Sequence, residues 1–272
     1  MKTRVISGVV LVILALAVIL TGGYFLAGVL LLLAFVAYRE LMKACKLAEE
    51  KKVNGLELIG YIGIAAYYLL VVFTKDRTYL LLTLIVALVA YMFLYVFTFP
   101  KYNAGQIMCS FFCLAYAPVM LSFIYMVREL EYGIYLVWMI FISSWVCDTC
   151  AYFSGVLLGR HKLAPVLSPK KSVEGAVGGI LGSMVVGGLY AYFVVESVIS
   201  GQQIFWIFVL ISGVGAVVSQ VGDLAASAIK RNHDIKDYGK LIPGHGGIMD
   251  RFDSVIFTAP MIYFLAYLLI HV

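Results

Sequence analysis

Charged residues are scarce in this sequence, which excludes an ordinary soluble domain. Only 13% of its residues are charged, about half of the ~25% that soluble proteins carry, whereas 63% are hydrophobic. The mean hydropathy is +1.00. Alternation of apolar and polar residues is also lacking, so the continuous apolar runs favour helices over a membrane β-barrel. The composition therefore predicts an all-α integral membrane protein.

About nine apolar runs are long enough to cross a bilayer, whose hydrocarbon core takes roughly 20 helical residues. They lie near residues 5–21, 24–42, 56–73, 79–98, 106–126, 133–157, 175–196, 203–229 and 252–271. Lys2 and Arg4 precede the first run as they would in a signal peptide, but no A-x-A-like cleavage site follows. We therefore predict an uncleaved first span.

Positive charge predicts how these spans are oriented. With the N-terminus in the cytoplasm, only Lys75, Arg77 and Arg128 of the 20 lysines and arginines lie on the outer side. Because short cytoplasmic loops carry the excess of lysine and arginine, this distribution predicts a cytoplasmic N-terminus and an external C-terminus. The polar site should then face the cytoplasm.

Several kinds of catalytic site are missing. No Ser/His/Asp triad and no activated cysteine is evident, so the sequence does not favour acyl transfer. Cys147 and Cys150 form a C-x-x-C pair inside an apolar run, where we interpret them as packing thiols. A zinc site there would need two more ligands, and no other Cys/His pair is spaced to supply them.

Polar residues gather instead between Ser227 and Asp253, at the border of the last two spans. Asp223 shares one helical face with Ser219, Gln220, Ser227 and Lys230. Asp250 and Asp253 are three residues apart at the start of the last span, so they lie on one side of that helix. Carboxylates at cytoplasmic helix ends around one loop predict a divalent-cation site, and magnesium suits hard oxygen ligands of this kind.

Two loops could bind phosphate. The glycines around His245, Gly246 and Gly247 would let backbone N–H groups approach phosphate oxygens. In the predicted cytoplasmic loop 159–175, Lys170 and Lys171 precede a predicted helix start at Ser172, with Glu174 in the first turn. Asp148 lies within the sixth span, where a carboxylate costs about 2.5–3.5 kcal/mol and so should face a cavity or a cation. The small residues of the 175–196 span allow close helix packing, either within the chain or in a homodimer.

The stretch 227–253 reads S-x-I-K-R-x4-K-D-x-G-x2-I-P-x-H-G-G-x2-D-R-x-D. Upstream, Asp148 stands with Tyr152, Gly155 and Gly159, and Ser168-Pro169-Lys170-Lys171-Ser172-x-Glu174-Gly175 follows. Together these motifs closely resemble the signature of the phosphatidate cytidylyltransferases (CDP-diacylglycerol synthases). The resemblance covers residues 148–253, and Cys150 departs from it because a small residue such as glycine is expected there.

The resemblance implies transfer of CMP from CTP to phosphatidic acid with Mg²⁺, and a second cation is compatible with it. It implies Asp223 and Asp250 as the main metal ligands, with Asp148 supporting metal or nucleotide. It places phosphates on Lys170, Lys171, Lys230, Arg231 and Lys236, and the triphosphate near His245, Gly246 and Gly247. Asp237 and Asp253 would orient basic neighbours, and Ser172, Glu174 and Arg251 would take part in substrate binding.

Residues 1–130 are accordingly predicted to be a transmembrane scaffold and residues 131–272 the catalytic transmembrane domain. The expected partners are CTP, phosphatidic acid and membrane lipids, and no nucleic acid. Two related enzymes stay open, a CTP-dependent polyprenol kinase and a cytidylyltransferase acting on another lipid. A membrane transporter is the alternative from another class, since intramembrane aspartates can also line an ion pathway.

Overall fold

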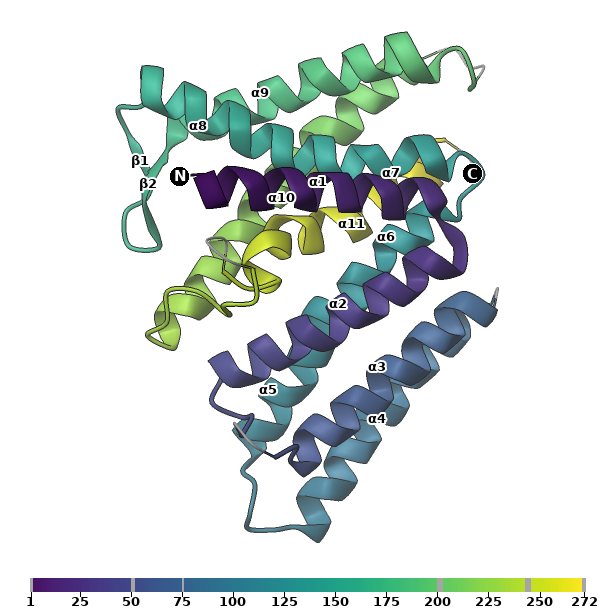
Figure 1. Cartoon of the computed structure of the whole chain (residues 1–272), viewed down its shortest axis with the longest axis vertical. Helices are drawn as coiled ribbons and strands as arrows, with labels where there is room; N and C mark the ends of the chain where they lie inside the picture. The colour runs from purple at the N-terminus through teal and green to yellow at the C-terminus, as the bar shows by residue number, and fades with distance from the viewer. Residues whose placement is uncertain (1, 50–51, 75, 200–202, 243–245, 271–272) are drawn as a thin grey trace. The chain divides into compact units, whose positions relative to one another are not determined.

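The computed structural model describes residues 2–49, 52–74, 76–199, 203–242 and 246–270, which are mostly helical (Figure 1). Within these residues, 8 helices are long and apolar enough to cross a membrane. They run over Gly23–Ala44, Gly55–Phe73, Thr78–Phe97, Ala104–Arg128, Gly133–Leu158, Val173–Val195, Ile204–Asn232 and Met249–Leu269. Each lies within a few residues of a predicted span. The prediction of an all-α integral membrane protein is therefore confirmed, and α1 (Lys2–Thr21) covers the first predicted run.

Two compact units share the chain. The first comprises Met1–Tyr125 and His233–Arg251, and the second comprises Met126–Asn232 and Phe252–Val272. The charged loop after residue 232 thus belongs to the same unit as the N-terminal helices. The predicted division into a scaffold and a catalytic domain concerns function, and it stays a prediction.

The first unit contains five numbered helices and most of a sixth. They are α1, α2 (Gly23–Ala44), α3 (Gly55–Phe73), α4 (Thr78–Phe97), α5 (Ala104–Leu114) and, after the π-helical turn η1 (Ala115–Val119), α6 (Met120–Arg128). Helices α3 and α4 lie side by side (Figure 1). Asn54 and Asn103 begin α3 and α5 with capping boxes. In each box the asparagine side chain accepts the backbone N–H of the residue three positions on, and the side chain of that residue accepts the backbone N–H of the asparagine. These caps fix where the two spans begin.

The second unit consists of α7 (Gly133–Phe141), η2 (Ile142–Val146), α8 (Cys147–Leu158), α9 (Val173–Tyr190), η3 (Ala191–Val195), α10 (Ile204–Asn232) and most of α11 (Met249–Leu269). The π-helical turn η2 ends one residue before the helix that carries Asp148. Such turns insert an extra residue into a helix and often occur next to functional sites.

Between α8 and α9 the structure differs from the predicted loop. Residues 162–172 of that segment form an antiparallel hairpin of β1 (Lys162–Ala164) and β2 (Ser168–Ser172), which projects from the ends of the two helices (Figure 1). Lys162 pairs with Ser172 and Ala164 with Ser168. Residues 165–167 form the turn between the two strands. Pro165 favours a turn there because its ring fixes the backbone angle φ. The hairpin gives Lys170 and Lys171 a defined strand position instead of a flexible one.

Helix α9 packs through its small residues, as predicted. A Cβ added at Gly182 would lie 2.5 Å from Cys150 Sγ, and one added at Gly179 would lie 2.8 Å from the carbonyl oxygen of Cys147. Cys147 is fully buried and Cys150 is partly buried, so the interpretation of both as packing thiols is confirmed. Gly182 also explains how α8 tolerates Cys150 where the resembling family is expected to have a smaller residue.

We expect Gly182→Ala to destabilise the second unit, because the new methyl group would lie 2.6 Å from Cys150 Cβ. Overpacking of this kind costs about 1–3 kcal/mol. Thermal unfolding in detergent would measure the loss. Gly28→Ala is the matched control, since nothing lies within 4 Å of its added Cβ. The double variant Cys150→Gly/Gly182→Ala should recover part of the lost stability. Equal stability of wild type and Gly182→Ala would contradict this packing.

Candidate active site

A cavity of about 510 Å³ opens in the second unit between α8, the hairpin, α9 and α10. Five of the residues predicted to bind metal or substrate line it, and they come from three separate segments: Asp148, Lys170, Lys171, Ser172 and Asp223. The rest of the lining is mostly small or apolar, and Ser168 and Gln220 add two uncharged polar side chains. The fold therefore brings carboxylates and lysines together in one concave site.

The charges in this unit are mixed. The Lys171 ammonium forms an ion pair with Asp223 Oδ2, and the two side chains are 28% and 26% exposed. Asp148 and Asp253 both interact electrostatically with Asp223, and Lys230 does so with Asp253. Lys170 also lines the cavity, so the three carboxylates Asp148, Asp223 and Asp253 are matched by the three lysines Lys170, Lys171 and Lys230. The site therefore offers both positive and negative groups in equal number.

The donor set suits magnesium better than a soft metal. Aspartate oxygens are the hard ligands that Mg²⁺ prefers, and Mg²⁺ is usually held by one or two carboxylates, with water and phosphates as the other ligands. Across the described residues, no three carboxylates have oxygen atoms all within 4.8 Å of one another. The aspartates therefore do not form a closed protein cage, and they leave room for phosphate and water ligands.

Glu174 and Ser172 fix the approach to the cavity. The Glu174 carboxylate accepts hydrogen bonds from the backbone N–H groups of Arg160 (3.0 Å) and His161 (3.2 Å), and it lies 2.6 Å from His161 Nδ1. Ser172 Oγ accepts the N–H of Gly175 at 3.1 Å and caps α9, so the predicted helix start is confirmed. Both side chains therefore have structural roles, and their contact with substrate stays a prediction.

In the first unit, Asp250 organises the signature loop. Its Oδ2 accepts the backbone N–H groups of Tyr238 at 2.8 Å and Gly247 at 3.0 Å, and the side chain is buried. Gly246 has φ +86°, a conformation that favours glycine, and an added Cβ there would lie 2.9 Å from Asp250 Oδ2. The glycines thus let the loop fold closely around Asp250, whose predicted role as a metal ligand stays a prediction.

Sequence reasoning missed Glu40, on α2. Its Oε1 accepts the N–H of Ile248 at 3.1 Å and its Oε2 accepts the N–H of Met249 at 2.9 Å, so this buried carboxylate caps the start of α11. Added Cβ atoms at Gly239 and Gly247 would lie only 2.2 and 2.4 Å from Oε1. The signal was available, because Glu40 is a carboxylate inside the predicted 24–42 span, and such residues are costly unless they are partnered.

The other predicted residues are placed as follows. Lys230 and Arg231 are in the last turn of α10, and Arg251 is exposed in the first turn of α11. Lys236 and Asp237 are exposed in the loop of the first unit, and Asp253 is partly buried on α11. His245 lies outside the described residues. The roles assigned to all of these side chains stay predictions.

The fold and the cavity define a polytopic helical membrane protein with a site of aspartates and lysines. Comparison with known proteins narrows that class. The model of the cytidylyltransferase family matches residues 2–269, nearly the whole chain. The chain belongs to the cytidylyltransferase family.

Curated relatives cover the chain to the same extent. The phosphatidate cytidylyltransferase of Staphylococcus saprophyticus is 34% identical over 265 residues, which is 96% of this chain and 97% of the relative. That of Staphylococcus haemolyticus is 32% identical over 267 residues, with the same coverage. That of Staphylococcus aureus strain N315 is 31% identical over 267 residues, again with the same coverage. The similarity therefore extends beyond the two motifs to the N-terminal helices.

Proposed function

We propose that this protein transfers CMP from CTP to phosphatidate, giving CDP-diacylglycerol and pyrophosphate. The cavity where Lys170, Lys171, Asp148 and Asp223 meet carries the proposal, because it offers cations for phosphates and carboxylates for a metal ion. The names of the relatives support the same reaction. We further propose nine spans, with the N-terminus in the cytoplasm, the C-terminus outside and the site at the inner leaflet of a bacterial plasma membrane.

In the proposed reaction the substrate supplies its own nucleophile. A phosphate oxygen of phosphatidate, already anionic at neutral pH, attacks the α-phosphorus of CTP. The new P–O bond forms as the bond from the α-phosphorus to the oxygen bridging the β-phosphorus breaks, and the electron pair leaves with pyrophosphate. Lys170 and Lys171 would hold the phosphates and offset the charge that develops on the leaving group. No protein nucleophile is needed.

Mg²⁺ would be held by Asp223 with help from Asp148, and the family resemblance adds Asp250. Bound there, the ion would neutralise phosphate charge, and the family resemblance is compatible with a second cation. Lys171 pairs with Asp223 in the structure, and both residues line the cavity in which phosphate and cation would meet.

The decisive experiment follows the cytosine ring. Purified protein in detergent is given phosphatidate, Mg²⁺ and CTP labelled in cytosine, and the label is followed into the organic phase. We expect labelled lipid and an equal amount of pyrophosphate, because the whole CMP group moves in a cytidylyl transfer. The Asp250→Asn variant should produce no labelled lipid, whereas Asp76→Asn, on an exposed loop, should match the wild type.

Other products would contradict the proposal in specific ways. Aqueous CDP together with a phosphorylated lipid alcohol would indicate a CTP-dependent polyprenol kinase. Labelled lipid formed from a different lipid phosphate, and not from phosphatidate, would indicate a cytidylyltransferase for another lipid. The absence of both products in folded protein would favour a transporter.

A further inference from the structure

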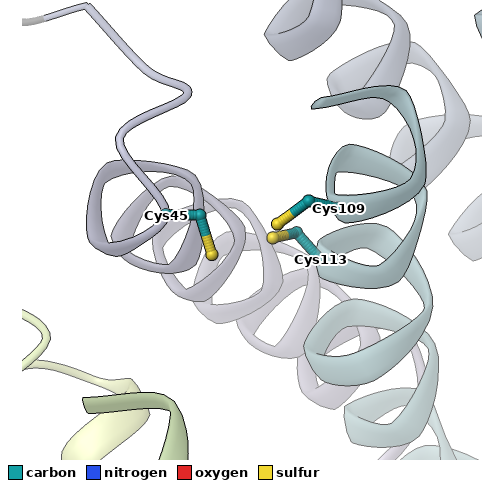
Figure 2. Close-up of side chains that lie close together, drawn as sticks. All are labelled: Cys45, Cys109 and Cys113. Carbon is teal, nitrogen blue, oxygen red and sulfur yellow. The ribbon is translucent and has the colours of Figure 1, made fainter. Parts of the chain in front are cut away.

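Three cysteines that are far apart in the sequence meet in the first unit. Cys45 follows α2 as its C-cap residue, and Cys109 and Cys113 are one turn apart on α5 (Figure 2). Their sulfur atoms all lie within 4.8 Å of one another. None of these cysteines is among the residues of the candidate active site.

The spacing of the sulfurs matches that of thiolates around one ion. A zinc–sulfur bond of about 2.3 Å places the ligand sulfurs of a trigonal or tetrahedral site roughly 3.8–4.0 Å apart. Three sulfurs within 4.8 Å can reach that arrangement through small side-chain rotations. Thiolates are soft ligands, so the site would select a thiophilic ion over Mg²⁺.

The surroundings also suit a cation. Cys45 and Cys109 are partly exposed, which gives an ion access, while Cys113 is fully buried and closes the inner side. Cys45 is the C-cap residue of α2, where the helix carries partial negative charge, and Lys43 in the last turn adds a positive charge.

We propose that Cys45, Cys109 and Cys113 form a binding site for a thiophilic cation of the zinc type. Binding displaces the thiol protons to solvent and leaves the metal in its divalent state, so the step needs no redox partner. The ion would tie the end of α2 to α5. Because α2 also carries Glu40, which caps α11, the ion would brace the segment that holds the Asp250 loop.

Cobalt is the probe, because Co²⁺ adopts zinc geometry and bound thiolates give it an intense charge-transfer absorption that carboxylates do not. The full-length protein is reduced, freed of metal with a chelator and titrated anaerobically with Co²⁺, then with Zn²⁺. We expect one thiolate-bound Co²⁺ per chain, displaced by Zn²⁺. We also expect Zn²⁺ to raise the melting temperature by roughly 5–10 °C at a free concentration about 100-fold above Kd.

Matched serine variants separate this site from the other thiols. Cys45→Ser/Cys109→Ser should lose the cobalt–thiolate band and the thermal shift, whereas Cys147→Ser/Cys150→Ser should keep both. If the double variant folds poorly, Cys45→Ser alone suffices, since Cys45 lies beyond the end of α2, and it should weaken binding by at least about 10-fold. None of these readouts uses CTP or lipid, so they are independent of the proposed reaction.

Three results would overturn the proposal. One is cobalt binding by the wild type without the thiolate band, which would indicate carboxylate ligands. Another is an unchanged band in Cys45→Ser/Cys109→Ser. The third is a disulfide between two of the three cysteines that persists under the reducing conditions, which mass spectrometry of the digested protein would reveal.

Discussion

Asp223→Asn should lower cytidylyl transfer on the order of 10³-fold, the effect of removing a group that stabilises charge in a transition state. Asp223 pairs with Lys171 and interacts with Asp148 and Asp253, so three charged groups of the second unit act on this one carboxylate. Asparagine keeps the shape but loses the charge that a cation needs. Turnover measured against Mg²⁺ concentration tests the prediction.

The Asp223→Asn variant should still fold, because the substitution has two opposing effects on stability. Lys171 loses its partner, while Asp148 and Asp253 lose a repulsive neighbour. We therefore expect a similar melting temperature for variant and wild type. Asp76→Asn is the control: Asp76 accepts the N–H of Thr78 at 2.9 Å on an exposed loop, and its loss should leave turnover unchanged. Full activity of Asp223→Asn at ordinary Mg²⁺ concentrations would refute the assignment.

Glu40→Gln should lower turnover by about 10- to 100-fold, the usual effect of removing a positioning group behind a ligand. Glutamine keeps one acceptor for Ile248 or Met249 and turns an NH₂ group toward the other backbone N–H. Hydrogen bonds to charged groups contribute about 1.5–3 kcal/mol, so stability should fall as well. The start of α11, which carries Asp250, would lose its fixed position.

A variant of a second buried glutamate, Glu57, serves as the control that distinguishes a loss of positioning from a loss of stability. Glu57 is fully buried and caps α3 by accepting the N–H of Asn54 at 3.3 Å. Glu57→Gln should lower the melting temperature and leave kcat near the wild-type value. In Glu40→Gln we expect a fall in kcat that persists at saturating CTP and at temperatures where the variant is fully folded. Equal kcat values in the two variants would show that Glu40 is only structural.

The membrane spans could be predicted from local sequence because each residue contributes its own hydropathy to a span. A helix of about 20 apolar residues satisfies its own backbone in lipid, so each span is specified without reference to its neighbours. Predicted runs such as 56–73 and 133–157 therefore agree closely with Gly55–Phe73 and Gly133–Leu158. The Ser172 cap was predictable for the same reason, since the side chain bonds a backbone group only three residues away.

The candidate site could be predicted in part. Asp148, Lys171 and Asp223 were recognisable one at a time, as costly charges in or beside apolar runs. That they line one cavity depends on how α8, the hairpin and α10 pack. The hairpin itself was missed because residues 159–175 lack a clear alternating pattern, and its strands are stabilised by pairing with each other and by Glu174.

The sequence by itself thus determined the membrane class, the approximate spans, the family signature and the polar residues worth testing. Only the tertiary structure decided that Glu40 caps α11 and that Cys45 joins Cys109 and Cys113. The physical reason is the range of the interactions. Hydropathy and helix capping act over a few neighbouring residues, whereas these contacts join segments separated by long stretches of chain, and only helix packing sets their distances.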